Sequence, residues 1–129
     1  LERGEYEGEL ESLCERRGLA CIPYFGLARG FLSGKYRRDG EMPDGPRAAG
    51  VRESYFNDRG FAVLDALDEI AAAHETSVAA VALAWLRVQP TVLAPIASAT
   101  STEQLAQLLA STEVELTAAE LERLDAVSR

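Results

Sequence analysis

The chain has 129 residues, 47% of them hydrophobic and 26% charged, which is ordinary for a folded, soluble domain or part of one. Its net charge of −8 argues against nucleic acid or an anionic membrane as the main partner. No apolar run reaches the length of about 18 residues that spans a membrane.

The first predicted element is a helix that ends at a glycine. Apolar residues recur at helical spacing from Tyr6 to Cys14, and Gly18 is placed to cap the C-terminus. The apolar run at 19–22 follows, and Pro23 ends it. This short run predicts a buried strand of a parallel sheet.

A long segment without periodicity comes next. Residues 26–57 contain six glycines and two prolines and repeat neither a helical nor a strand pattern. They predict a loop of about 30 residues, far longer than most connections between elements. Loops of this length are either disordered or functional.

Two helices and a second strand follow the loop. We expect helix caps at Asn57 and Ser77 and a helix stop at Pro90. The apolar stripe of the first helix is Phe61, Leu64, Leu67 and Ile70 or Ala71. The apolar face of the second helix is Val78, Val81, Ala82 and Trp85. The run at 92–97 is the second buried-strand candidate, although Pro95 cannot donate to a ladder.

Two capping-box patterns open the last two helices, one at Ser101 and one at Thr117. Leu116 is expected to pack against Leu121 as a hydrophobic staple, and both Leu121 and Leu124 are expected to face the core. The apolar residues of the first of these helices are Leu105, Leu108 and Leu109.

The order of elements predicts an α/β fold with a parallel sheet, because strands alternate with helices along the chain. Two strands are too few, since each leaves unpaired backbone groups on an open edge. We therefore expect further strands from sequence outside this chain or from a second copy. The start at Leu1, without Met or a leader, is the one expected of an internal segment.

The segment after the first strand carries the most chemistry. Ligands of parallel α/β proteins bind beyond the carboxyl ends of strands. Tyr24 offers a face to a planar ring there, the glycines let the backbone approach a phosphate, and Lys35 adds positive charge. A glycine-rich loop with a lysine is a weak signal by itself.

Residues 95–105 also suit a phosphate, because a strand end leads through a small polar turn to a helix start with free N–H groups. Plain capping by Ser101 is the interpretation that these residues alone favour. The two cysteines, Cys14 and Cys21, follow no metal-ligand spacing, so no metal site is predicted and a reducing cytoplasm fits. The single histidine, His74, is expected to be solvent-exposed and without a catalytic role.

These segments resemble the aldo/keto reductase family from end to end and in the same order. Residues 23–36 are similar to its pattern after the seventh barrel strand, an aromatic and then small-Pro-Leu-Ala-x-Gly-x-Leu-Ser/Thr-Gly-Lys-Tyr. Residues 95–105 resemble its eighth-strand pattern, Ile-Pro-Gly-x-x-x-x-x-Gln-Leu. Leu1-Glu2-Arg3 resembles the end of its Tyr-Asn-Leu-x-x-Arg stretch, and 116–125 its closing helix. The likeness is greatest to bacterial members with a long loop.

The resemblance implies the C-terminal portion of a TIM (β/α)8 barrel. Residues 1–129 would be a single incomplete domain with two parallel strands, flanking helices and a long cofactor-covering loop at 26–57. It also implies binding of NADP(H), with NAD(H) as the second candidate.

The resemblance carries over to ten positions of this sequence. Tyr24 matches the aromatic that stacks on nicotinamide. The positions beside the pyrophosphate are Phe25, Gly26, Leu27 and Ala28, with Lys35 and Arg47 as cations. The positions around the adenosine 2′-phosphate and ribose are Ser98, Thr100 and Gln104.

Several positions depart from the family pattern. Phe25 replaces a usual Ser, and Ser98 and Thr100 stand where Gly and a cation are common. Gln107 and Leu108 replace a Glu-Asn pair that contacts adenine. The lost cation weakens the argument for NADPH over NADH.

The activity that the resemblance implies is the reduction of aldehydes or ketones, as small carbonyl substrates, to alcohols with NADPH in the cytoplasm. The catalytic Asp, Tyr, Lys and His are expected before Leu1, so the 129-residue chain alone is predicted to be inactive. Two alternatives remain open. One is a non-catalytic, nucleotide-sensing relative such as a potassium-channel β-subunit, and the other is a half-barrel that self-associates through its open edges.

Overall fold

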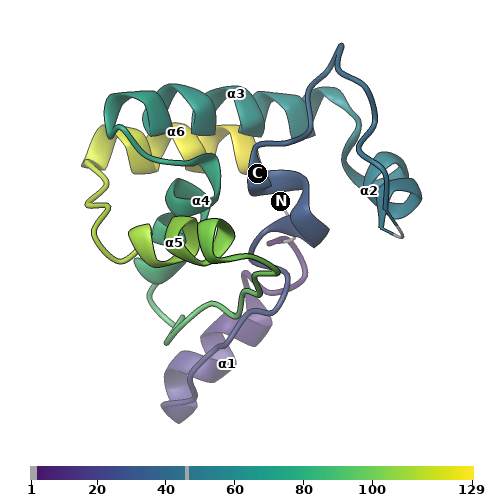
Figure 1. The fold of residues 1–129 in the computed structure, drawn as a ribbon. Helices are drawn as coiled ribbons and strands as arrows, with labels where there is room; N and C mark the ends of the chain where they lie inside the picture. The colour runs from purple at the N-terminus through teal and green to yellow at the C-terminus, as the bar shows by residue number, and fades with distance from the viewer. Residues whose placement is uncertain (1–2, 46) are drawn as a thin grey trace.

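The computed structural model describes residues 3–45 and 47–129, so Leu1, Glu2 and Pro46 lie outside the described residues. Its elements are α1 (Glu9–Arg17), the 3-10 helix η1 (Ala28–Ser33), α2 (Ala48–Tyr55), α3 (Asp58–Ala73), α4 (Val78–Arg87), α5 (Thr102–Ala110) and α6 (Ala118–Ser128). Figure 1 shows α3 and α6 side by side, with α1 projecting at the opposite end of the molecule. Within the described ranges, no helix is long and apolar enough to cross a membrane.

The core is built on α3, as its apolar stripe predicts. The helix packs against both α4 and α6. The side-chain oxygen of Asn57 caps it by accepting the N–H of Gly60 at 2.8 Å. The buried residues of the stripe, together with one of the two predicted core residues of α6, are Phe61, Leu64, Leu67, Ile70, Ala71 and Leu124. The predicted cap and these core residues are therefore confirmed, whereas Leu121 is only half-buried.

The helix α4 is buried more completely than its amphipathic pattern requires. The Ser77 hydroxyl caps it as predicted and accepts the N–H of Ala80 at 3.1 Å. Every residue from Val78 to Ala84 is buried. The many alanines keep the helix narrow, so that it contacts α3, α5 and η1 at once.

The two predicted buried strands are replaced by two extended segments. Residues 19–22 and 92–97 run parallel and share one isolated bridge, between Cys21 and Val92. The predicted burial is wrong, because the large side chains exposed there are Leu19, Ile22, Leu93 and Ile96. A strand buried on both faces needs partners on both edges, and within the described residues each segment pairs only with the other.

The helix α1 ends as predicted, but its apolar residues stay uncovered. Gly18 adopts the left-handed conformation at φ 61° and ψ 33°. Leu10 and Leu13 are 48% and 40% exposed. Leu105 and Leu109 of α5 are likewise exposed. Two helices therefore present apolar faces to solvent in this chain.

The predicted loop at 26–57 is a folded segment, which corrects the expectation of a structureless connection. It contains η1 and α2, and the fully buried ring of Phe31 lies among four other rings. Its centroid is 5.4 Å from Tyr55, 5.8 Å from Tyr36, and 6.0 Å from both Phe56 and Phe61. We call these five residues the aromatic cluster. The sequence pattern missed α2 because a helix of eight mixed residues is too short to show a clear period.

The predicted caps form at both α5 and α6, but only one box is complete. At α6, Thr117 Oγ1 accepts the N–H of Glu120 at 3.3 Å, and the Glu120 carboxylate accepts the N–H of Thr117 at 2.7 Å. At α5, Ser101 Oγ accepts the N–H of Gln104 at 3.2 Å. The Gln104 side chain turns to Thr100 instead of Ser101, so the predicted box there is half formed.

His74 is not the solvent-exposed residue that the sequence predicts. Its Nε2 lies 2.9 Å from Oε1 of Glu120, and their side chains are 25% and 19% exposed. This contact joins the end of α3 to the start of α6. Burial opposes the charged form of Glu120, but hydrogen bonds from Thr117 and the contact with His74 outweigh it, so the pKa of Glu120 is lowered.

We predict that Phe31→Ala lowers the free energy of unfolding by about 3–5 kcal/mol, because it empties the centre of the aromatic cluster. Urea denaturation measures this change, and limited proteolysis should show faster cleavage within residues 37–45. Tyr24→Ala is the matched control, since Tyr24 is 71% exposed and its loss should cost under about 0.5 kcal/mol. Equal losses in the two variants would contradict the central place of Phe31.

We predict that Glu120→Gln lowers the free energy of unfolding by about 1 kcal/mol near neutral pH. The folded-state pKa of Glu120 lies below the unfolded value, so its ionised form stabilises the fold above that value. This stabilisation is lost as pH falls through the folded-state pKa. Thermal unfolding from about pH 3 to about pH 7 should therefore show the two proteins converging in acid.

Glu122→Gln, an exposed change on the same helix, provides the control for Glu120→Gln. It should track the parent chain at every pH. A difference between Glu120→Gln and the parent that stays constant with pH would show that the carboxylate charge has no part in the effect.

Candidate functional site

The two segments that carry the sequence motifs meet at their ends. The N–H of Cys21 donates to the carbonyl of Thr91 at 2.8 Å, and the N–H of Leu93 donates to Cys21 at 2.9 Å. Further along, the N–H of Ile96 donates to the carbonyl of Pro23 at 2.9 Å. These bonds place the start of the first motif beside the start of the second, although about 70 residues separate them in sequence.

Gly26 fixes the first motif against the helix α4. A Cβ at this position would lie 3.0 Å from Leu86 Cδ1, 3.2 Å from Leu83 Cδ2 and 3.6 Å from Pro95 Cβ. The absent side chain therefore permits a close approach of backbone to helix. Both motifs and α4 converge on this glycine.

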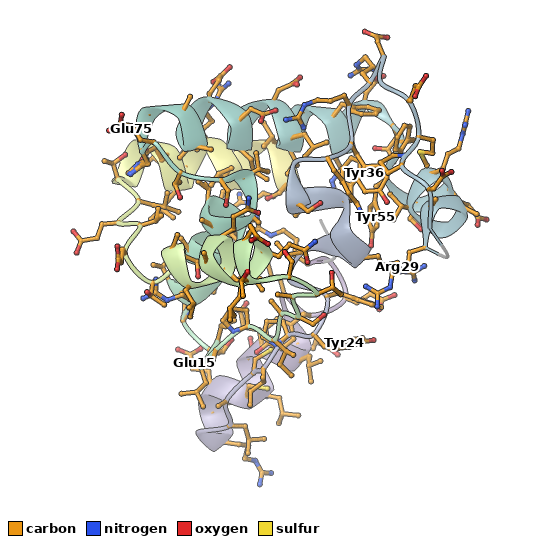
Figure 2. All side chains as sticks on the ribbon, viewed as in Figure 1. Glu15, Tyr24, Arg29, Tyr36, Tyr55 and Glu75 are labelled. Carbon is orange, nitrogen blue, oxygen red and sulfur yellow. The ribbon has the colours of Figure 1, made fainter. Side chains whose placement is uncertain are left out.

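Tyr24 and Phe25 present aromatic surface to solvent. Their rings have centroids 4.2 Å apart and are 71% and 39% exposed as residues. Figure 2 shows Tyr24 pointing outward on the same side of the molecule as Arg29. An exposed pair of rings can accept the face of a planar ligand.

A cavity of about 570 Å³ lies next to these rings. Four of the ten predicted cofactor residues line it, namely Tyr24, Phe25, Gly26 and Ala28. Arg29 and Trp85 also line it, and neither is among the ten. The cavity is therefore bounded by the first motif on one side and by α4 on another.

The turn that follows Phe25 has an unusual backbone. Ala28, Arg29 and Gly30 have φ values of 47°, 59° and 94°. The left-handed conformation costs a residue with a side chain roughly 1–2 kcal/mol. Leu27 stabilises the turn, because its carbonyl accepts the N–H groups of Gly30 at 2.8 Å and Leu32 at 3.1 Å.

The two predicted cations lie on the segment between η1 and α2. Lys35 is exposed, and its Nζ is 5.2 Å from the ring centroid of Tyr36. Arg47 is also exposed and occupies the N-cap of α2, where its carbonyl accepts the N–H of Val51 at 3.0 Å. Neither residue lines the cavity.

The predicted residues of the second motif bond to one another. The Oε1 of Gln104 accepts the N–H of Thr100 at 2.9 Å and its hydroxyl at 3.1 Å, whereas Ser98 is exposed. Hydrogen bonds from its own backbone N–H and from the hydroxyls of Ser101 and Thr102 lower the pKa of Glu103. The start of α5 is thus capped by its own side chains, in agreement with the interpretation that the residues alone favour.

Two features of this region were not predicted from the sequence. One is Arg29, and the signal that could have indicated it is a cation between Gly26 and Gly30, just after the aromatic Phe25. The other is Arg3, whose guanidinium lies 4.9 Å from the Trp85 ring and donates to Asp125 at 3.1 Å and to Ser128 at 2.6 Å. No local pattern reveals the second feature, because its residues come from both ends of the chain.

Comparisons with known proteins agree with these observations. The sequence model of the Aldo/keto reductase family matches residues 3–129. Probable aldo-keto reductase 1 from Glycine max is 27% identical over 121 residues, which cover 93% of this chain and 35% of that protein. The NADH-specific methylglyoxal reductase of Escherichia coli (strain K12) is 30% identical over 120 residues, which cover 88% of this chain and 35% of that protein.

Solved structures show the same likeness in the fold. The glycerol dehydrogenase AKR11B4 from Gluconobacter oxydans superposes with a TM-score of 0.77 at 24% identity, covering 95% of this chain and 38% of that one. The thermostable aldo-keto reductase Tm1743 has a TM-score of 0.67 at 23% identity, covering 98% of this chain and 36% of that one. The described chain therefore has the fold of part of these reductases.

Proposed function

This chain belongs to the aldo/keto reductase family, and we propose that it holds the nicotinamide dinucleotide of an oxidoreductase that reduces small aldehydes or ketones to alcohols. The chain spans 35% of the length of both curated relatives. The activity of the whole protein therefore belongs to the proposal. We propose further that the chain is the C-terminal portion of a TIM barrel.

The observation that carries the proposal is the meeting of the two motifs, the first of which lines the cavity. The bond from Ile96 to Pro23 brings them together, and Gly26 holds the first motif against α4. Dinucleotides bind at strand ends in α/β proteins, where backbone can approach a phosphate. This arrangement supports one elongated ligand that contacts both motifs.

The residues present fit the nicotinamide and pyrophosphate of a dinucleotide better than they fit its adenosine end. Tyr24 has an exposed ring on which the nicotinamide would stack, and the backbone of residues 25–28 with Lys35 would face the pyrophosphate. When bound, the nicotinamide supplies the hydride for the carbonyl carbon. The chain would bind and orient this ligand.

No catalytic residue is proposed within this chain, and its own burial pattern supports that assignment. Tyr36 and Tyr55 are only 2% and 4% exposed in the aromatic cluster, and neither residue lines the cavity. His74 pairs with Glu120. The proton donor and its partners would come from strands that complete the barrel, contributed either by a longer protein that contains this chain or by a second copy. The exposed apolar faces of α1, α5 and the extended segments support such partner strands.

For the cofactor we propose NADP(H), with NAD(H) as a second candidate that two observations favour. Residues 98–104 contain hydroxyls but no Lys or Arg to bind a 2′-phosphate. One relative is named as an NADH-specific methylglyoxal reductase. For the location we propose the cytoplasm, since Cys14 and Cys21 are free thiols, as a reducing compartment maintains them.

We predict that a full-length protein containing this chain oxidises NADPH or NADH in the presence of small aldehydes, whereas the purified 129-residue chain does not. In this proposal the proton donor for the alkoxide lies outside the 129 residues. Absorbance of the reduced cofactor measures turnover, and the emission of Trp85, which lines the cavity, reports cofactor binding. Turnover by the 129-residue chain, or no cofactor binding by the full-length protein, would overturn the proposal.

We predict that Thr100→Arg raises the preference for NADPH over NADH by about tenfold, because a charge-assisted bond to a phosphate is worth roughly 1.5–3 kcal/mol. Fluorescence titrations with both cofactors give the ratio of dissociation constants. Thr112→Arg adds the same charge at the far end of α5 and serves as the control. A similar gain in both variants would show a general charge effect in place of a 2′-phosphate contact.

A further inference from the structure

The only two cysteines of the chain meet at one tyrosine hydroxyl. Cys14 belongs to α1, and Cys21 lies in the first extended segment. Both thiols contact the hydroxyl of Tyr6, whose oxygen also lies 2.7 Å from Oγ1 of Thr91. Both cysteines are half-buried and carry free thiols. Two sulfur atoms that contact the same oxygen are neighbours, so the fold brings the two thiols together.

The backbone between the two cysteines explains why they meet. The helix α1 ends at Gly18 in the left-handed conformation, and the N–H of Leu19 donates to the carbonyl of Cys14 at 2.8 Å. The chain therefore turns back after α1 (Figure 1). The N–H of Cys21 donates to the carbonyl of Thr91, the residue whose hydroxyl meets Tyr6. These bonds place the two cysteines on facing elements, as a disulfide requires.

One of the two thiols is open to small molecules. Cys21 and Tyr6 both line the cavity of about 570 Å³, whereas Cys14 does not line it. A small oxidant that enters the cavity therefore reaches Cys21 first. Sensor cysteines commonly combine an accessible thiol with a second thiol poised beside it. Cys21 and Cys14 have this arrangement.

The Tyr6 hydroxyl suits a sulfur atom that gains negative charge. Its removal from water raises the pKa of Tyr6 to about 12, so the hydroxyl keeps its proton at neutral pH. The thiolate is the reactive form of cysteine, and a protonated hydroxyl can donate a hydrogen bond to it. Tyr6 therefore supports the reactive form of either neighbouring thiol.

We propose that Cys14 and Cys21 form a reversible disulfide when a hydroperoxide oxidises this protein. The Cys21 thiolate attacks a peroxide oxygen and breaks the O–O bond, which gives a sulfenic acid and one water. The sulfur of Cys14 then attacks the sulfenic sulfur and displaces its hydroxyl as a second water. Both sulfurs are oxidised, the peroxide is reduced, and the two thiol protons leave in the waters. Exchange with an external thiol restores the reduced pair.

The disulfide would fasten a helix that the rest of the chain holds weakly. No residue of α1 is buried, whereas Cys21 makes the parallel bridge to Val92. Leu10 of α1 and Cys21 both line the cavity, so a covalent link would fix the spacing of two of its walls. Disulfides in a reducing compartment are usually transient and redox-sensing. The redox state of the pair would thus set the shape of the cavity.

The test is a map of disulfides in a full-length protein that contains this chain. The protein is treated with hydrogen peroxide, its remaining thiols are blocked, and it is digested with trypsin without reduction. Trypsin cleaves after Arg16 and Arg17, so the link joins the peptides 4–16 and 18–29. Mass spectrometry should find this pair after peroxide and lose it after dithiothreitol. This measurement needs no cofactor, so it is independent of the proposed function.

A second cysteine position on α1 provides the matched control. Ser12→Cys in a Cys14→Ser background keeps two thiols at a similar separation in sequence. Residues two apart on a helix point in different directions, so the new thiol should not face Cys21. Its link to Cys21 should therefore form more slowly than the parent link by about tenfold or more.

Three outcomes would overturn the inference. The first is oxidation of Cys21 to the sulfinic or sulfonic acid without the linked peptides, which would show that Cys14 is out of reach. The second is an equal rate of linking in the control variant, which would show that the position of Cys14 has no part in the reaction. The third is a link that dithiothreitol does not reduce in the folded protein, which would exclude a reversible modification.

Discussion

The packing of Phe31 within the aromatic cluster is the contact on which the rest of the structure depends. Both halves of residues 26–57 meet at this ring, which is fully buried, and α3 begins beside it. Gly60 makes the join possible, since any Cβ there would lie 2.0 Å from the carbonyl oxygen of Tyr55. Because both ends of the segment pack on Phe31, the turn at 24–30, which carries Arg29 at the cavity, is supported by a buried core. Rigid support of this kind is what a binding turn needs to hold its geometry.

The two extended segments, 19–22 and 92–97, are only partly paired. They pair with each other, but their outer edges have no partner strand among the described residues. One parallel bridge aligns them, and this alignment is enough to bring the two motifs together. It is not enough to form a sheet, because backbone groups on the outer edges have no strand to pair with among the described residues. Apolar side chains on these segments, on α1 and on α5 consequently face solvent. Burial of such surface against further strands would be strongly favoured, which is the physical basis for proposing partner strands.

The two parts of the proposed site, the start of α5 and the turn around Arg29 and Lys35, differ in how strongly they would attract an anion. At the start of α5, Ser101, Gln104 and Glu103 already use N–H groups of the helix terminus, so a phosphate there would compete with the chain's own side chains. Around Arg29 and Lys35 the cations stack on rings and carry uncompensated charge. In the proposed arrangement the stronger anion attraction would lie at the pyrophosphate end of the ligand, and the residues near the adenosine end would contribute hydroxyls. This difference explains why the sequence around Ser98 and Thr100 leaves the choice between NADP(H) and NAD(H) open.

Local patterns in the sequence were sufficient for the core helices α3, α4 and α6 and for the family, but not for α2. The stripe of α3, the caps at Asn57, Ser77, Ser101 and Thr117, and the end of α1 at Gly18 all follow from neighbouring residues, because capping and helical periodicity act within one or two turns. Residues of the first motif were identified from the same short range, although their role in binding stays a proposal. Only the tertiary structure decided that residues 26–57 fold around Phe31, that the extended segments are exposed, and that Arg29 lies against Phe25 and Gly50. The first two outcomes depend on contacts between residues far apart in the chain. The third depends on a left-handed backbone at Arg29, a conformation that an arginine disfavours. No local pattern in the sequence encodes either of these.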